Sequence, residues 1–146
     1  MDARQEDPSR MADTTRPAVP YEIKTPDAVR PDILAPIDYA YKDRRDITVT
    51  IRQPEFTSVC PMTGLPDYGT ITLRYRPARS IIELKSFKYY LLQYRNVGIF
   101  YEHVVNRILD DLVAKLAPQW MEVQGTFTAR GGITTEVVAQ YAAQPL

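Results

Sequence analysis

Residues 104–128 read VVNRILDDLVAKLAPQWMEVQGTFT, and within this stretch one structural period gives way to another. Before Pro118, apolar residues recur every three or four positions, which predicts an amphipathic helix that the proline ends. The stripe consists of Val104, Val105, Ile108, Leu109, Leu112, Val113 and Leu116. From Trp120 to Thr128, apolar and polar residues alternate instead, which predicts a strand with one buried face.

Further strand and helix patterns flank this stretch. Ile133–Ala139 reads as a second strand, joined to the first by a turn at Arg130-Gly131-Gly132. Upstream, Ile82–Tyr94 has a helical period. Residues 46–53 and 70–76 alternate as strands do. The predicted order is therefore strand, strand, helix, helix, strand, strand.

This order predicts the α+β class, as a four-stranded antiparallel sheet with two helices on one face. Such a layer arrangement buries one face of the sheet and leaves the other partly open. The edges of so small a sheet remain unpaired within one chain. Oligomerisation through those edges is a natural remedy.

The 146-residue chain has the composition of one globular domain, with 45% hydrophobic residues. The 18 Lys+Arg balance the 18 Asp+Glu, so we expect no direct binding to nucleic acid. One Cys and one His cannot build a zinc site that needs two thiolates, and we expect no metal. Neither a membrane span nor a signal peptide can be recognised, so we expect a cytoplasmic protein without a membrane partner.

The N-terminal part of the chain differs from the rest in its proline content. Six of the 12 prolines fall in residues 1–36, where they are interleaved with charges and follow no period. We therefore expect a Pro-rich, partly disordered arm over residues 1–36 and a folded domain over residues 37–146. The arm either orders against a neighbouring subunit or stays a solvated tail, and the tail is favoured for residues 1–20.

The segment Pro54–Gly69, which joins the first two predicted strands, is too long for a tight turn and contains Cys60 and Asp67. A lone cysteine is most often buried and inert, but the Ser, Thr, Pro and Gly around Cys60 indicate a turn. A nucleophilic thiol needs a proton acceptor or a cation nearby. Asp67 could reach back across the loop, whereas His103 is better explained as an exposed helix residue than as a protease-like partner.

Three cationic side chains are candidates for binding phosphate. Lys85 and Lys88 are three residues apart on a predicted helix turn, and Arg130 precedes two glycines. Judged alone, such lysines most often form a solvated face, and an arginine before two glycines can simply belong to a hairpin. No GxGxxG motif follows a strand, so a dinucleotide would bind in some other way than in a Rossmann fold.

Two stretches of the chain resemble the QueF family of nitrile reductases. Residues 83–90, ELKSFKYY, are similar to that family's Glu-(Ser/Leu)-Lys-(Ser/Ala)-aromatic/aliphatic-Lys-x-aromatic signature, and residues 55–68, EFTSVCPMTGLPDY, resemble its catalytic loop. Weaker matches are Arg95-Asn96, Phe100-x-Glu102 and residues 125–132. The resemblance covers residues 46–133 or so, which is most of the predicted domain.

The resemblance implies a fold and an activity. The fold is the tunnelling fold, whose subunit has the ββααββ order predicted above and whose sheets join into a ring or barrel in a homo-oligomer. The activity is the NADPH-dependent reduction of the nitrile 7-cyano-7-deazaguanine to 7-aminomethyl-7-deazaguanine. This reaction uses two NADPH and lies on the route to the tRNA nucleoside queuosine.

The resemblance also implies roles for single residues. Cys60 would add to the nitrile carbon to form a thioimide, and Asp67 would move the protons. Glu102 would accept hydrogen bonds from the base. Further substrate contacts would be Ile82, Glu83, Leu84 and Tyr101, and the NADPH contacts would be Lys85, Ser86, Lys88 and Arg130. Tyr101 stands where the best-known form of the family has a His, and a tyrosine does not titrate near neutrality.

Two other functions would use the same fold. A pteridine-pathway enzyme such as a cyclohydrolase would keep the base-holding glutamate, although its zinc-dependent kind needs more His and Cys than this chain has. A non-catalytic, ring-forming module that binds a purine or pterin would place no demand on Cys60. Tight base binding without turnover would identify such a module.

Overall fold

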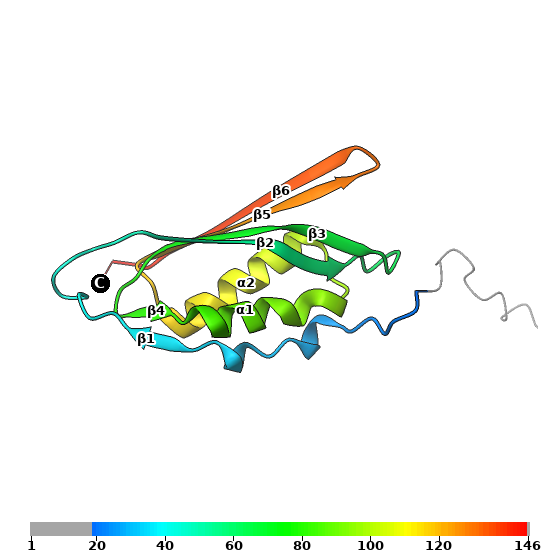
Figure 1. Cartoon of the computed structure of the whole chain (residues 1–146). Coiled ribbons are helices and arrows are strands. Elements are labelled where there is room, and N and C mark those ends of the chain that lie inside the picture. The colour runs from blue at the N-terminus through cyan, green and yellow to red at the C-terminus, as the bar shows by residue number, and fades with distance from the viewer. Residues whose placement is uncertain (1–18, 146) are drawn as a thin grey trace, which may run out of the picture.

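The computed structural model describes residues 19–145, in which two helices lie against one face of a sheet (Figure 1). The sheet is antiparallel, with the strand order β2-β3-β5-β6. Its strands are β2 (Val49–Val59), β3 (Pro66–Arg76), β5 (Trp120–Arg130) and β6 (Ile133–Ala142). The helices are α1 (Leu84–Leu92), followed by a 3₁₀ turn at Gln93–Asn96, and α2 (Tyr101–Leu116). The predicted α+β layer and its element order are confirmed.

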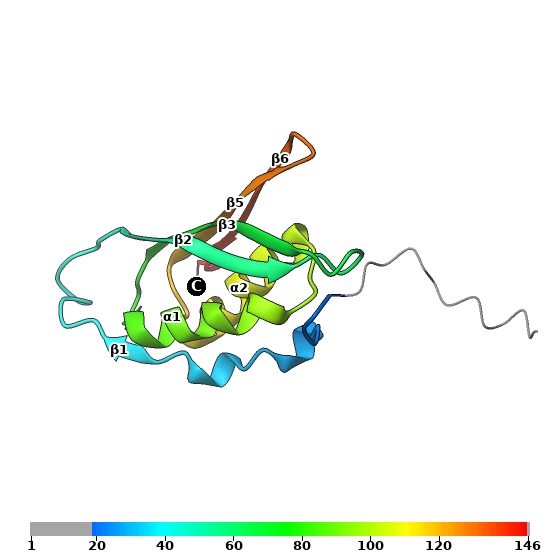
Figure 2. The ribbon, with the colours of Figure 1, turned by 45° about the vertical axis from the view of Figure 1, so that its right-hand side comes forward.

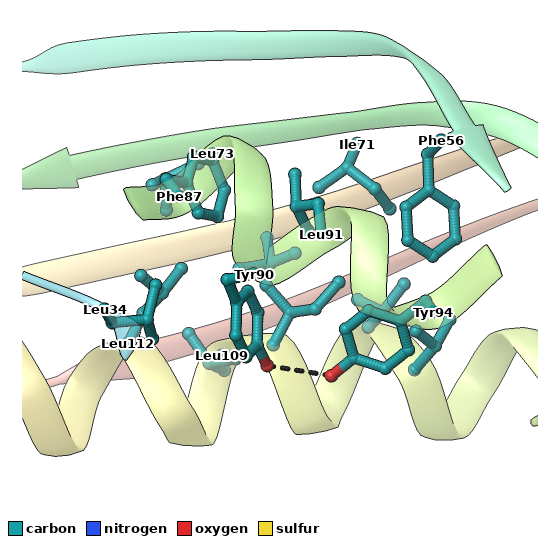
Figure 3. Close-up of a cluster of buried hydrophobic side chains, with 14 of the residues drawn as sticks. Leu34, Phe56, Ile71, Leu73, Phe87, Tyr90, Leu91, Tyr94, Leu109 and Leu112 are labelled. Carbon is teal, nitrogen blue, oxygen red and sulfur yellow. Dashed lines mark hydrogen bonds between the residues drawn. The ribbon is translucent and has the colours of Figure 1, made fainter. Parts of the chain in front are cut away.

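The core fills the space between the sheet and the helices (Figure 3). Ile71 and Leu73 point down from β3, and α1 and α2 supply residues such as Leu91 and Leu112. Two buried tyrosines of this core are not purely apolar, because the hydroxyls of Tyr90 and Tyr94 bond to each other at 2.8 Å. The apolar period of α2, with its buried Val104, Val105, Ile108, Leu109, Leu112 and Leu116, matches the prediction.

The predicted long loop between the first two strands is wrong. β2 continues to Val59 and β3 begins at Pro66, which leaves only residues 60–65 between them. The sequence hides this continuation because the register shifts between Gln53 and Phe56, where Pro54 interrupts the alternation. A proline has no N–H to donate, and it is tolerated at such a bulge on an edge strand.

The structure also contains a small sheet that the sequence analysis does not predict. Strands β1 (Pro36–Asp38) and β4 (Ser80–Ile82) pair antiparallel, and three residues are too few to show a period. Part of the predicted arm leads into this sheet through 3₁₀ turns at Pro26–Ala28 and Pro31–Ile33. Val29 and Leu34 on this segment are buried in the core, and residues 1–18 of the arm lie outside the described residues.

The hairpin of β5 and β6 extends beyond the layer of helices (Figure 2). Its turn is the predicted one, because Gly131 and Gly132 both have positive φ, at 57° and 83°. That backbone suits glycine and fits the twist of a two-residue hairpin turn. Within residues 19–145, no helix is both long and apolar enough to cross a membrane.

Candidate active site

Cys60 lies at the end of β2, where a short turn fixes it. The Cys60 N–H donates to the Leu65 carbonyl at 3.0 Å, and the Cys60 carbonyl accepts from the Gly64 N–H at 2.8 Å. The preceding residue, Val59, pairs with the segment that leads into α2, through bonds of 3.0 Å to the Val97 carbonyl and 3.1 Å from the Ile99 N–H. The thiol is therefore held close to the N-terminal end of α2.

Asp67, near the start of β3, is the buried carboxyl of this region, with 4% of the residue exposed. Its Oδ1 accepts a hydrogen bond of 2.9 Å from the Tyr101 hydroxyl. The same oxygen accepts from a guanidinium nitrogen of Arg130 at 2.7 Å. Arg130 also reaches the Thr63 hydroxyl at 3.5 Å, so the turn after Cys60, β3, α2 and β5 all meet here.

The environment moves the pKa of the thiol and that of the carboxyl in opposite directions. Burial works to raise the pKa of the Cys60 thiol, but hydrogen bonds from Thr63, from nearby backbone N–H groups and from Arg130 outweigh it, so the pKa lies below its ordinary value. Burial raises the pKa of Asp67, although hydrogen bonds from Tyr101 and Arg130 oppose it. The two pKa values are drawn together, which eases the transfer of a proton between the two groups.

Tyr101 reaches Asp67 because its ring is stacked on Phe127, with the centroids 3.8 Å apart and the planes 12° from parallel. Phe127 in turn occupies space that two glycines leave open. A Cβ on Gly69 would lie 2.8 Å from Cδ1 of the Phe127 ring, and one on Gly125 would lie 2.7 Å from its Cε2. The absence of side chains at Gly69 and Gly125 therefore sets the position of Phe127 and, through it, that of Tyr101.

Glu102 and His103 follow Tyr101 in the first turn of α2 and are exposed. The His103 ring packs edge-on against Phe100, with the centroids 5.6 Å apart. Beside them, next to the Cys60 turn, lies a pocket of about 380 Å³. Its lining residues are Pro26, Pro61, Gly98, Ile99, Phe100, His103 and Arg107. A planar ligand could lie in this pocket close to Glu102 and to the cysteine.

The other predicted site residues gather at the start of α1. Glu83 caps this helix, and its two carboxylate oxygens accept the backbone N–H groups of Lys85 and Ser86 at 2.7 Å each. These two bonds lower the pKa of the Glu83 carboxyl. The Ser86 hydroxyl is also engaged, because it donates to the Glu83 carbonyl at 2.7 Å and accepts from the Ala35 N–H at 3.0 Å.

Lys85 and Lys88 are both exposed, and they border different hollows. Lys85 lines a pocket of about 370 Å³ together with Ile33, Glu83, Ser86 and Tyr89. Lys88 instead borders the groove between α1 and β2. Among the ion pairs of residues 19–145, none involves either lysine, so both ammonium groups can meet an anion.

The start of α1 and the group of Cys60 and Asp67 lie at opposite ends of β3, whereas Lys88, further along α1, borders β2 between these ends. The Ile82 N–H donates to the hydroxyl of Tyr75 at 3.1 Å, which places the start of α1 beside that tyrosine. Asp67 lies eight steps away from Tyr75 on the same strand, which is about 26 Å at roughly 3.3 Å per residue. Arg130, predicted to bind with Lys85 and Lys88, lies at the Asp67 end instead.

Thr63 and Phe127 belong to the site, although their sequence context does not single them out. Both fall inside stretches that carry the resemblance, and that was the one signal available for them. The contacts of Phe127 depend on the register between β3 and β5, which a single sequence does not reveal. Within residues 19–145, no group of three or more His, Cys, Asp or Glu side chains is placed to hold a metal ion.

Comparisons with known proteins agree with one another. A family model described as "QueF-like protein" matches residues 66–145. A protein of Chloroherpeton thalassium named NADPH-dependent 7-cyano-7-deazaguanine reductase is 54% identical over 116 residues, which are 80% of this chain and 99% of that protein. The protein of the same name from Chlorobaculum tepidum is 57% identical over 111 residues, 76% of this chain and 94% of its own.

Among solved structures, the archaeosine synthase QueF-Like in its apo form has a similar fold, with a TM-score of 0.59. The match covers 68% of this chain and 96% of that one, at 24% sequence identity. At this identity, the comparison supports only a similarity of fold.

Proposed function

This chain belongs to the QueF-like family, and we propose that it acts as an NADPH-dependent 7-cyano-7-deazaguanine reductase in which Cys60 is the nucleophile. Its sheet with two helices on one face is the tunnelling fold. The observation that carries the proposal is the cluster of Cys60, Asp67, Tyr101 and Arg130. In it, a thiol of lowered pKa lies beside a carboxyl of raised pKa.

In the first step, Sγ of Cys60 attacks the nitrile carbon. One S–C bond forms and one C–N π bond breaks. The proton of the thiol passes to Asp67 and from there to the nitrogen, so the product is a neutral thioimide. Arg130 stabilises the thiolate before the attack, and Tyr101 holds Asp67 in place. Asp67, reprotonated from solvent, then donates the later protons as the nitrogen becomes an amine, and the S–C bond breaks to return the Cys60 thiolate.

The substrate's ring system fits the pocket beside Pro61 and Phe100, next to the Cys60 turn. Glu102, exposed at the same end of α2, would accept the N–H groups of the deazaguanine. Tyr101, between Phe100 and Glu102 in the sequence, bonds to Asp67 through its hydroxyl. Ile82, Glu83 and Leu84 lie at the far end of β3 and can approach the same ligand only from another copy of the chain.

The start of α1 suits the phosphates of NADPH. Lys85 and Lys88 supply two ammonium groups that form no ion pair within the described chain, and Ser86 keeps the helix cap in place. NADPH, when bound, supplies the hydride that reduces the carbon, and two molecules are needed for one nitrile. Arg130 is engaged with Asp67, so we assign it to the nucleophile rather than to the cofactor.

A homo-oligomeric ring would bring the two groups together. β2 and β6 are the edges of the sheet and can pair with neighbouring copies. A cytoplasmic location and a place in queuosine biosynthesis, with no direct contact to the tRNA, complete the proposal.

Intact-protein mass spectrometry tests the proposal. The purified protein, incubated with 7-cyano-7-deazaguanine and no NADPH, should gain the mass of one substrate molecule per chain. Cys60→Ala should gain nothing and should not turn over, while its unfolding temperature stays close to that of the wild type. A mass gain in Cys60→Ala, or turnover by it, would remove Cys60 from the reaction.

A further inference from the structure

Ser58 carries a buried hydroxyl whose lack of a hydrogen-bond partner in the described chain is unusual for a native fold. Ser58 is fully buried, with 0% of the residue exposed, and its Oγ has no hydrogen-bond partner among residues 19–145. Buried polar atoms in native proteins almost always have a partner, and an exception often marks a functional site. No step described above uses this residue.

The position of Ser58 connects the two reacting groups of the proposed mechanism. It lies on β2, two residues before Cys60, which is the first residue of the turn after the strand. In the antiparallel register, Ser58 lies directly opposite Asp67 of β3. The Cβ atoms of such a pair are about 4.5–5.5 Å apart, a span that a hydrogen bond between a serine and a carboxylate can bridge.

The two oxygens of Asp67 are not equivalent. Oδ1 accepts from both Tyr101 and Arg130, at 2.9 and 2.7 Å. Within the described chain, Oδ2 has no donor of its own. An oxygen that already accepts two bonds, one of them from a cation, is a poor site for a proton. The proton that Asp67 carries therefore belongs on Oδ2, the oxygen that lacks a donor.

We propose that Ser58 is a positioning residue, whose hydroxyl donates to Oδ2 of Asp67 when that carboxyl is ionised and orients it to take up the proton of Cys60. This inference rests on the proposed function, because it assumes that Asp67 moves protons. A serine hydroxyl suits the task, since its side chain has three staggered rotamers and turns away once Oδ2 is protonated. The proton on Oδ2 is then free for the nitrile nitrogen.

The test compares Ser58→Ala with the wild type over a range of pH. The titratable or charged groups that face Asp67 are Tyr101 from α2, Arg130 from β5 and Cys60 from the turn after β2. None of them changes in this variant. Loss of a donor to the carboxylate should move the acid limb of the kcat profile to higher pH. At the optimum, kcat should fall about 10- to 150-fold, the effect of one hydrogen bond to a charged group, with KM for the nitrile unchanged.

A matched control and a second variant keep the test decisive. Thr57→Ala removes a hydroxyl from the next residue of β2, on the other side of the strand, and should leave both kcat and the acid limb in place. Ser58→Cys retains a weak donor, so its acid limb should lie between those of the wild type and Ser58→Ala. If Ser58→Ala does not fold, the acid limb of Ser58→Cys alone tests the inference, and an acid limb at the wild-type position overturns it.

Two results overturn the inference, and both differ from a failure of the proposed function. An acid limb in Ser58→Ala that coincides with the wild type, with or without a loss of kcat, means that Ser58 is only structural. The same holds if Ser58→Ala lowers the residual rate of Asp67→Asn as much as it lowers that of the wild type. If the wild-type protein neither gains mass from the nitrile nor turns it over, the proposed function fails, whatever Ser58 does.

Discussion

Asp67 is buried, yet the proposed chemistry needs its carboxyl in the ionised form. Because burial raises its pKa, the folded protein binds a proton there more tightly than the unfolded chain does. Linkage then gives the sign: stability falls as pH rises from the ordinary range of an aspartate through the raised pKa. At neutral pH, the ionised carboxylate of Asp67 therefore lowers the free energy of unfolding, and the proposed chemistry nevertheless needs it.

Asp67→Asn should thus raise the unfolding temperature at pH 7 while removing most of the activity. The amide keeps an acceptor for the Tyr101 hydroxyl and lacks the charge. Thermal unfolding of both proteins from pH 7 downward gives the measurement. The gain in unfolding temperature over the wild type should shrink as the pH falls and vanish below the ordinary pKa of an aspartate. A variant less stable than the wild type at pH 7 would show that the ion pair with Arg130 outweighs burial.

Tyr101→Phe tests how Asp67 is tuned. The hydroxyl of Tyr101 lowers the pKa of Asp67 against the effect of burial, so its removal should raise that pKa further. A smaller fraction of Asp67 is then ionised at a given pH, and the acid limb of adduct formation should move to higher pH. The rate of mass gain with the nitrile, measured at several pH values, reports this directly. Tyr68→Phe is the control, because Tyr68 is exposed on the neighbouring position of β3.

Among the elements, the ones with a clear period could be predicted from the sequence. The stripe of α2 and the alternation of β5 reflect one buried face each, and both elements are where the period places them. Pro54 breaks the alternation of β2, so the sequence pattern hides the second half of that strand. Cys60 and Asp67 could be singled out from their local sequence. Their contacts with Tyr101 and Arg130 could not, since these join residues 34 and 63 positions away from Asp67 through the register of the sheet.

Gly69 of β3 carries a prediction at the scale of elements. A Cβ there would meet the Thr126 carbonyl oxygen at 2.7 Å and the Phe127 ring at 2.8 Å, and the carbonyl belongs to the neighbouring strand β5. Gly69→Ala should therefore push β5 and the Phe127 ring away and displace Tyr101. We expect a loss of about 1–3 kcal/mol in unfolding free energy, as for other overpacked sites, and a slower rate of adduct formation.

Urea unfolding and the mass assay, run on the same samples, measure both effects of Gly69→Ala. Gly98→Ala is the matched control, because the nearest atom to its new Cβ is Cγ2 of the Ile23 side chain at 3.1 Å, and the nearest backbone atom is 3.5 Å away. Gly98→Ala should lose less unfolding free energy than Gly69→Ala. If Gly69→Ala proved as stable and as fast as the wild type, the Phe127 ring would not depend on the space above that glycine.

For the molecule as a whole, the separation of the site residues is the main constraint. About 26 Å of β3 lies between the Cys60 and Asp67 end and the start of α1, given roughly 3.3 Å per residue. A nicotinamide ring cannot reach a thioimide on Cys60 while its phosphates are held by Lys85 at the start of α1 of the same chain, unless the dinucleotide spans most of the sheet. We propose that a second copy, joined through the edge strands β2 and β6, supplies these cofactor contacts.

Mixing two inactive variants tests this arrangement. Cys60→Ala lacks the nucleophile, and the double variant Lys85→Ala/Lys88→Ala should turn over little at an NADPH concentration far below its KM. In a ring assembled from equal amounts of both, about a quarter of the interfaces should combine an intact Cys60 from one copy with intact lysines from the next. Activity at low NADPH should then recover to about a quarter of the wild-type value. Cys60→Ala mixed with Asp67→Asn is the control, because both changes lie at the same end of one chain and no interface regains a complete site. Mixed oligomers that form in both cases and stay inactive in both would place the whole site within a single chain.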